Sequence, residues 1–248
     1  MKIYSYDCVE STNLIAKELA LTSQAPHGTA VVAQRQTAGK GRYGRKFCSP
    51  VGGIYMSVVL HRGELPFAIF GDSPTLVTAH AAAAVCKAIE AACDIQPQIK
   101  WVNDIFMPSD FVPGRKVCGI SAEAVCDLTQ LIIGIGLNFD TPQSAFPAEL
   151  RDKVTSLFPE NATPTISRSE LIASICANLL DANAFTLHEY KRRMFMLKQK
   201  VLVLPANSEA YEATALDIDN TGQLVIQKDS GEIIALSSGE VSVRQTPP

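Results

Sequence analysis

The chain has 248 residues, of which 47% are hydrophobic and 19% charged, which is the balance of an ordinary globular protein. The formal net charge is −3, so general affinity for nucleic acid is not favoured and a basic cluster is a local feature. The N-terminal residues hold no long apolar segment, and no stretch reaches the length needed to span a bilayer. This length suits one large domain, or a main domain with a small one.

Cysteine and histidine spacing gives no sign of a disulfide framework or of a metal site. The seven cysteines are odd in number, scattered, and without a C-x-x-C motif. That pattern is typical of reduced thiols in a cytosolic core. The four histidines lie far apart, with no H-E-x-x-H or similar spacing. We expect a cytoplasmic protein without a histidine-based metal site.

A helix is expected to begin at Ser11, Thr12 and Asn13, which precede the apolar run 14–20. Capping alone explains one of these three residues, or two. The remaining side chains are then available to bind a polar group at the positive end of the helix.

The stretch 37–47 is rich in both glycine and positive charge, and it follows a β-like run at residues 29–33. Its residues include Gly39, Lys40, Gly41, Arg42, Gly44, Arg45 and Lys46. Glycine leaves backbone N–H groups uncovered, so a cationic loop of this kind suits a phosphate or an acyl phosphate. The alternative is a solvated basic hairpin turn. Gln36 stands at the mouth of the loop, and its amide can both donate to and accept from a ureido group.

The middle of the chain predicts a strand, a buried helix and two short strands, in that order. Residues 54–60 are β-branched and aromatic, whereas residues 75–92 are apolar and rich in alanine. Residues 98–106 then read as two strands joined by a tight turn at Asn103 and Asp104. Lys100 and Asp104 place a cation beside a carboxylate, which suits a nucleotide phosphate and its Mg²⁺. Plain turn chemistry is the alternative.

Two longer β runs, at 115–125 and 131–139, are separated by a short polar connection and predict an antiparallel hairpin. Gly119, Gly134 and Gly136 lie within these runs. Glycine in a strand lets a flat ligand come close, so these positions indicate a ligand slot against the sheet. Gly134-x-Gly136 lacks the third glycine and the following helix of a dinucleotide-binding motif.

The last part of the chain changes from a helical pattern to short β runs. Ser167 and Glu170 have the form of a capping box at the start of a helix. From residue 199 the sequence consists of short β runs separated by turns such as 219–222 and 229–231. About fifty residues of this kind predict a small β domain.

Five motifs together resemble the biotin protein ligases in order and approximate spacing. They are Ser11-Thr12-Asn13, the loop Gly39-Lys40-Gly41-Arg42-x-Gly44-Arg45-Lys46, Lys100-Trp101-x-Asn103-Asp104, Lys116-x-x-Gly119-Ile120 and Gly134-x-Gly136-x-Asn138. The resemblance implies an α+β fold. A class II synthetase-like catalytic domain with a mixed sheet would span 1–198, and an SH3-like β-barrel would span 199–248.

The resemblance also implies the chemistry. ATP would activate biotin as biotinyl-5′-AMP with the help of Mg²⁺, and biotin would then pass to a lysine of a biotin carboxyl carrier protein. Lys116 and Arg42 are expected to be catalytic. The expected biotin or biotinyl-AMP contacts are Ser11, Thr12, Asn13, Gln36, Gly39, Lys40, Gly41, Arg42, Lys116, Gly119, Gly134, Gly136 and Asn138. Arg45, Lys100, Asn103 and Asp104 are expected near the phosphates, with Asp104 as a metal ligand.

Some positions depart from the family pattern. Phe47 stands where the family often has Trp, Val102 where it has Pro, and Tyr43 where Arg is common. The catalytic motifs begin near residue 11, so we expect no DNA-binding domain and no DNA partner. We also expect no membrane partner. The protein is expected to be a monomer or a homodimer. Two other functions stay open, namely a lipoate or octanoate ligase or transferase and a non-catalytic biotin-binding module.

Overall fold

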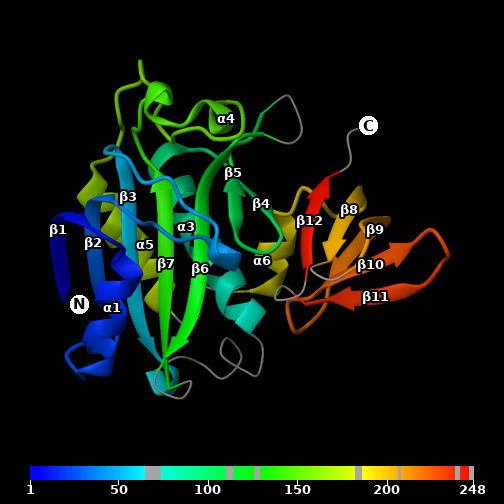
Figure 1. The fold of residues 1–248 in the computed structure, drawn as a ribbon, viewed down its shortest axis with the longest axis horizontal. Coiled ribbons are helices and arrows are strands. Elements are labelled where there is room, and N and C mark those ends of the chain that lie inside the picture. The colour runs from blue at the N-terminus through cyan, green and yellow to red at the C-terminus, as the bar shows by residue number, and fades with distance from the viewer. Residues whose placement is uncertain are drawn as a thin grey trace.

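The structure is a computed structural model that describes residues 1–64, 74–109, 114–125, 129–181, 186–205, 208–237 and 241–245. It contains a large mixed sheet flanked by helices and a smaller antiparallel sheet at the C-terminal end (Figure 1). The expected α+β fold with a small C-terminal β domain is therefore confirmed.

The large sheet has seven strands in the order β1-β2-β3-β7-β6-β5-β4. They are β1 (Ile3–Val9), β2 (Thr29–Gln36), β3 (Gly53–His61), β4 (Gln98–Lys100), β5 (Asp104–Phe106), β6 (Lys116–Val125) and β7 (Gln130–Asn138). β1 pairs with β2 in parallel, and the other neighbours pair antiparallel. The predicted hairpins at 98–106 and 115–139 are both present.

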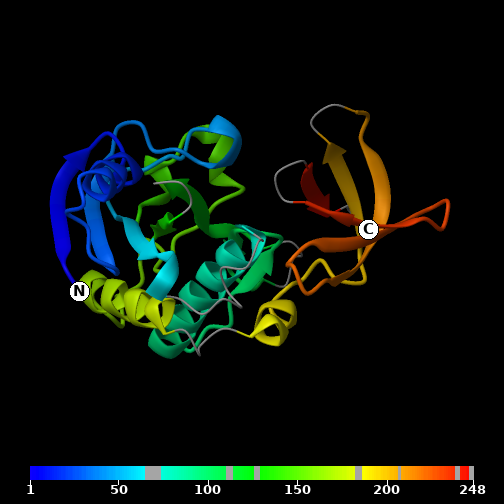
Figure 2. The same cartoon turned by 90° about the horizontal axis from the view of Figure 1, so that it is seen from below.

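Helices cover the two faces of this sheet unequally. On one face α1 (Thr12–Leu21) packs on β2, β3 and β7. The other face carries α3 (Pro74–Cys93) and α5 (Arg168–Leu180), which pack on each other, with α6 (Leu187–Arg192) beside α3 (Figure 2). A short helix, α4 (Ala148–Arg151), lies beyond the end of β7. Much of the α1 face is consequently left to loops.

Side chains along the central strands alternate between the two faces of the sheet. In β3 the even-numbered positions 54, 56, 58 and 60 join the core shared with α3, whereas Val59 joins the small cluster under α1. Because successive side chains point to opposite faces, Ser57 faces the α1 side with Val59. By the same alternation Gly134 shares a face with Ile132, which belongs to the α1 cluster. Small and polar residues therefore line the open face.

α3 corrects one expectation from the sequence. Residues 75–93 are long and apolar enough to cross a membrane by length and composition, although we expected no such stretch. In the fold, 72% of the most apolar window of that helix is buried inside the protein. α3 is thus a core helix, as its alanine-rich sequence predicts.

The C-terminal sheet has five antiparallel strands in the order β11-β10-β9-β8-β12. They are β8 (Lys200–Pro205), β9 (Tyr211–Ile218), β10 (Leu224–Lys228), β11 (Ile233–Leu236) and β12 (Val241–Gln245). The last strand pairs with the first, as expected for an SH3-like arrangement. Buried residues of this sheet, such as Val201 and Ile226, belong to the same apolar cluster as α3, so the two parts share a continuous core.

Candidate active site

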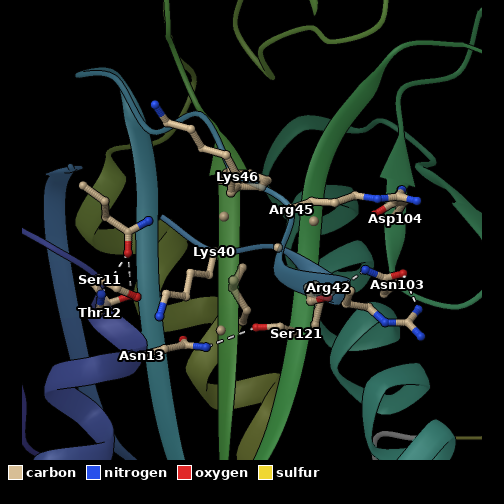
Figure 3. Close-up of a pocket in the computed structure, with 18 of the residues that line it drawn as sticks. Ser11, Thr12, Asn13, Lys40, Arg42, Arg45, Lys46, Asn103, Asp104 and Ser121 are labelled. Atoms are coloured by element: carbon tan, nitrogen blue, oxygen red, sulfur yellow. Dashed lines mark hydrogen bonds between the residues drawn. The ribbon is translucent and has the colours of Figure 1, made fainter. Parts of the chain in front are cut away.

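A cavity of about 210 Å³ lies on the α1 face of the large sheet, across β3, β7 and β6 (Figure 3). The start of α1, the glycine-rich loop and the β4–β5 hairpin complete its walls. Most of the residues expected at the site line this cavity, namely Ser11, Thr12, Asn13, Gln36, Lys40, Gly41, Arg42, Arg45, Lys100, Asn103, Asp104, Lys116, Gly119, Gly134 and Gly136. Segments far apart in the sequence thus meet at one place.

Two expected residues lie elsewhere. Gly39 is buried behind the loop, where an added Cβ would lie 2.6 Å from Oγ of Ser49 and 2.7 Å from the carbonyl oxygen of Phe47. Asn138 is 4% exposed, and its Nδ2 donates to the carbonyl of Thr155 at 3.0 Å. Asn138 lines a second cavity, of about 420 Å³, which shares Lys46, Phe47 and Lys116 with the first.

The end of the cavity near α1 is a hydrogen-bonding network built largely from amide and hydroxyl groups. The backbone N–H of Thr12 donates to Oε1 of Gln36 at 2.8 Å, and the Thr12 hydroxyl donates to the same oxygen at 3.2 Å. Nε2 of Gln36 donates to Oγ of Ser49 at 2.9 Å. Ser11 precedes the helix in an extended conformation, and its side chain makes no capping bond. The Gln36 amide is therefore held in one orientation beside the positive end of α1.

Asn13 is held from three sides at the same end. Oγ of Ser57 donates to its Oδ1 at 2.6 Å. Its Nδ2 donates to Oε1 of Glu123 at 2.6 Å and to Oγ of Ser121 at 3.3 Å. These contacts fix which atom of the amide accepts and which donates, so Asn13 presents a defined hydrogen-bonding pattern to a ligand.

Glycines form the floor between the two ends of the cavity. The strand register places Gly134 between Ser57 on β3 and Ser121 on β6, and Gly136 between Tyr55 and Gly119. A Cβ added to Gly134 would lie 2.6 Å from Oγ of Ser121, which is too close for any side chain. The absence of a side chain at Gly134 thus lets Asn13 and Ser121 approach the strand closely.

The glycine-rich loop is a hairpin that folds over this floor. The N–H of Phe47 donates to the carbonyl of Gly39 at 2.8 Å, and the N–H of Gly41 donates to that of Arg45 at 2.7 Å. The tip, Arg42–Gly44, is a 3₁₀ turn. Figure 3 shows Lys40 pointing toward the Asn13 end of the pocket, whereas Arg42 and Arg45 point toward Asn103 and Asp104.

The opposite end of the cavity carries the charged groups. Nζ of Lys116 lies 2.7 Å from Oδ1 of Asp104, and Nη1 of Arg42 donates to Oδ1 of Asn103 at 3.0 Å. Nδ2 of Asn103 in turn donates to the carbonyl of Ile120 at 2.8 Å. Lys100 and Asp104 are cross-strand partners, as the sequence suggested, and the Asp104 carboxylate also forms the ion pair with Lys116. Two cations and one carboxylate thus converge beside the floor.

The ring of Phe47 separates this cavity from its neighbour. A Cβ added to Gly119 would lie 3.1 Å from Cε2 of Phe47, and one added to Gly136 would meet the same ring. Nζ of Lys116 lies 5.8 Å from the ring centroid, and the Tyr55 ring packs edge-on against it. Phe47 therefore forms a wall common to both cavities.

Several residues of the site were not expected from the sequence. They are Ser49, Ser57, Ser121 and Glu123, which hold the polar end, and Trp101, which lines the cavity. Ser57 carried a usable signal, because it is a lone polar residue inside an otherwise apolar strand. Ser121 and Glu123 follow Gly119 at intervals of two residues, which puts all three on one face of β6.

No described cysteine lines the first cavity. Cys48 and Cys118 line the second cavity, and burial raises the pKa of both thiols above the ordinary range. Thiols kept protonated in this way are poor nucleophiles, so this arrangement does not suit acyl transfer through a cysteine.

Comparison with known proteins agrees with this geometry. Residues 5–138 match the family model described as "Biotin/lipoate A/B protein ligase family", and residues 199–244 match "Biotin protein ligase C terminal domain". The solved structure of "Biotin protein ligase from Aquifex aeolicus in complex with biotin and ATP" superposes with a TM-score of 0.81 at 26% identity, covering 99% of both chains.

Two curated relatives extend along most of the chain. "Bifunctional ligase/repressor BirA" of Bacillus spizizenii is 36% identical over 237 residues, covering 91% of this chain and 69% of that protein. "Biotin--[acetyl-CoA-carboxylase] ligase" of Mycobacterium tuberculosis is 27% identical over 241 residues, covering 93% of this chain and 85% of that protein. The motifs, the fold and these matches agree, and the chain belongs to the biotin protein ligases.

Proposed function

We propose that the cavity performs both half-reactions of a biotin protein ligase with the residues named above. A carboxylate oxygen of biotin attacks the α-phosphorus of ATP, and pyrophosphate leaves. The ε-amine of an acceptor lysine then attacks the carbonyl carbon of biotinyl-5′-AMP, an amide forms, and AMP leaves. The observation that carries the proposal is one cavity that joins an end lined by amide and hydroxyl groups to an end that carries Lys116 and Arg42.

The amide and hydroxyl end suits the ureido ring of biotin. A ureido group has a carbonyl acceptor and two N–H donors, and Thr12, Asn13 and Gln36 offer partners for both. Gly134 lacks the side chain that would crowd Asn13 and Ser121, and Gly136 lies under the ring of Phe47. Ser11 adds a hydroxyl at the start of the helix, where the dipole favours an acceptor atom of the ligand.

The cationic end suits the reacting anions. Biotin carboxylate and the ATP phosphates repel one another, and Lys116 and Arg42 reduce that repulsion while stabilising the charge that develops on phosphorus. Arg45 adds positive charge from the loop at this end, whereas Lys40 points toward the Asn13 end (Figure 3). We place Lys116 between the biotin carboxylate and the α-phosphate because it lies at the junction of the two cavities. Loop residues 39–47 exclude water from the anhydride when they close on it.

The second cavity suits the adenine ring. Its walls include Phe47, Phe106, Phe146 and Leu150, which offer apolar and aromatic surface. Asn138 lies among them, consistent with the expected position near the adenylate. Because the two cavities meet at Lys116 and Phe47, the acyl phosphate of a bound adenylate would lie at their junction.

Asp104 is the candidate ligand for Mg²⁺. Among the described residues no group of three or more His, Cys, Asp or Glu side chains could hold a metal ion alone. One carboxylate is nevertheless sufficient when substrate phosphates supply further oxygens, which is how Mg²⁺ usually binds in ATP-dependent enzymes. Mg²⁺ would neutralise phosphate charge, and Lys116 would keep the Asp104 carboxylate oriented.

We also propose the division of the chain into two domains. A boundary at 198/199 is supported by the start of β8 at Lys200 and by the C-terminal model beginning at residue 199. We place the reaction in the cytoplasm, with a biotin carboxyl carrier protein as acceptor. Free thiols at the described cysteines and the M. tuberculosis relative support these assignments.

Biotin-dependent ATP–pyrophosphate exchange tests the proposal. We expect exchange with biotin and none with lipoate or octanoate. Exchange with lipoate instead would move the assignment to a lipoate ligase of the same fold. Binding of biotin without any exchange would indicate a non-catalytic biotin-binding module.

A further inference from the structure

We propose that the turn between β9 and β10 of the C-terminal sheet positions the ATP end of the active site through Trp101. In this account Trp101 is a positioning residue, which acts through its neighbours on the β4–β5 hairpin. The proposal rests on the placement of ATP given above.

A buried hydrogen bond crosses between the two sheets at this point. Nε1 of Trp101 donates to the carbonyl oxygen of Gly222 at 3.0 Å, and the Trp101 side chain is 5% exposed. Trp101 also lines the cavity. Because a buried donor that loses its partner is destabilising, this contact constrains both segments.

Hydrogen bonds and packing hold the acceptor side of this bond. Oδ1 of Asp219 accepts from the backbone N–H groups of Thr221 and Gln223, at 2.8 and 2.9 Å. Gly222 has φ +81, and a Cβ added there would lie 3.1 Å from Cγ2 of Thr75 and 3.3 Å from Cδ2 of Leu76. The turn therefore packs against the start of α3, and a side chain at residue 222 would fit only if Thr75 and Leu76 shifted slightly.

The donor side leads directly to the charged end of the site. Residues 101–103 connect β4 to β5, and the carbonyl of Val102 accepts from the Tyr190 hydroxyl at 3.0 Å. Asn103 is the next residue. Its Nδ2 donates a hydrogen bond to the carbonyl of Ile120, and its Oδ1 accepts one from Nη1 of Arg42. A shift of Trp101 would thus move Asn103 and, through it, Arg42.

The biotin end is tied to other elements. Thr12 bonds to Gln36 on β2, and Gln36 to Ser49. Asn13 bonds to Ser57, Ser121 and Glu123 of the large sheet. Loosening the β9–β10 turn should consequently weaken ATP binding while leaving biotin binding unchanged.

Two glycines of the C-terminal sheet provide a matched pair of variants. Gly222 and Gly231 both have positive φ, +81 and +88, but nothing lies within 4 Å of a Cβ added to Gly231. Both Gly222→Ala and Gly231→Ala strain a turn, and only the first disturbs the contact with α3 and Trp101. We expect Gly222→Ala to raise the KM for ATP about tenfold, the scale of one buried hydrogen bond, with the KM for biotin unchanged. Gly231→Ala should change neither constant.

Trp101→Phe is the second test. It keeps a six-membered aromatic ring and removes the pyrrole part of the indole together with the N–H donor. It should reproduce the ATP effect of Gly222→Ala. Trp101 is the single tryptophan of the chain, so intrinsic fluorescence reports on this contact directly. The emission of Gly222→Ala should shift to the red relative to wild type and to Gly231→Ala.

Calorimetric binding of a non-hydrolysable ATP analogue separates this proposal from the catalytic one. If wild type shows no biotin-dependent exchange, the proposed function fails, while analogue binding by the three variants still tests the coupling. Equal ATP constants for Gly222→Ala, Trp101→Phe and wild type would overturn the proposal. Equal losses for biotin and ATP would also overturn it, since they would indicate a general structural role.

Discussion

Lys116 and Asp104 form an ion pair across neighbouring strands, with Nζ 2.7 Å from Oδ1, at the charged end of the cavity. Both side chains are partly exposed, at 27% and 23%. Water therefore screens the pair, and its contribution to stability is small. Its value lies in orientation, because the carboxylate holds the ammonium group at the junction of the two cavities before any ligand arrives.

Replacing Lys116 should therefore impair chemistry far more than folding. We expect Lys116→Ala to lose about 3 kcal/mol of transition-state stabilisation, or roughly two orders of magnitude in ATP–pyrophosphate exchange. Lys17→Ala, at an exposed position on α1, is the control. Urea unfolding of both variants should match that of wild type, and a large stability loss in Lys116→Ala alone would contradict this account.

Gln36 should act on biotin binding. Gln36→Ala removes both the acceptor for Thr12 and the donor to Ser49, so the KM for biotin should rise about tenfold or more while the KM for ATP is retained. Gln34 lies two residues earlier on the same strand, and its Nε2 donates to Asp7 at the exposed edge. Gln34→Ala is accordingly a matched control, and equal effects of the two variants would exclude a specific role for Gln36.

The Phe47 wall can be tested by a compensating pair. Gly136→Ala would place a methyl group in the space of the Phe47 ring, so activity should fall strongly. Phe47→Ala in the same chain removes the clash, and the double variant should recover part of the loss. Gly63→Ala, where nothing lies within 4 Å of the added Cβ, controls for the substitution itself. A double variant no better than Gly136→Ala would refute the contact.

Acid should weaken the fold through His80. This side chain is 1% exposed, and burial lowers its pKa below the usual value of 6.5, although the bond to the Leu179 carbonyl opposes the shift. The unfolded chain therefore binds a proton near pH 6.5 that the folded chain binds only at lower pH. The free energy of unfolding should consequently fall as the pH drops below 6.5.

Urea titrations at pH 7.5 and pH 5.5 measure that loss. His80→Gln should lose less stability between the two pH values than wild type, whatever its stability at pH 7.5. His188→Gln, at an exposed position, should keep the wild-type slope. If His80→Gln lost as much free energy of unfolding between the two pH values as wild type, the acid sensitivity would come from other groups. His27 is one such group, because its pKa is also lowered by burial.

Local sequence signals were sufficient for much of the site. Thr12 and Gln36 stood out as polar residues beside a helix start and a glycine loop, and the structure places them in contact. The glycines of the floor were readable because strand positions rarely favour glycine without a close neighbour. The order of five motifs then indicated the fold, including the small C-terminal sheet.

What the sequence could not supply were the pairings between distant segments. Lys100 and Asp104 face each other across a tight hairpin, as the sequence suggested, but the ion pair of Asp104 with Lys116 on the next strand was not predicted. Strand order brings Lys116 to Asp104, and that order is set by the packing of the whole sheet. The bond from Trp101 to Gly222 spans 121 residues and depends on how two domains dock, which no local pattern encodes.

The wall that Phe47 and Lys116 share between the two cavities also has a consequence for inhibitor design. A compound with a ureido ring at one end and a purine at the other would occupy both cavities, and its linker would lie beside Phe47 and Lys116. If its linker lacked the anhydride carbonyl, no amine could cleave it. The second half of such a molecule binds at a high effective concentration once the first is seated, so it would compete with both substrates at once.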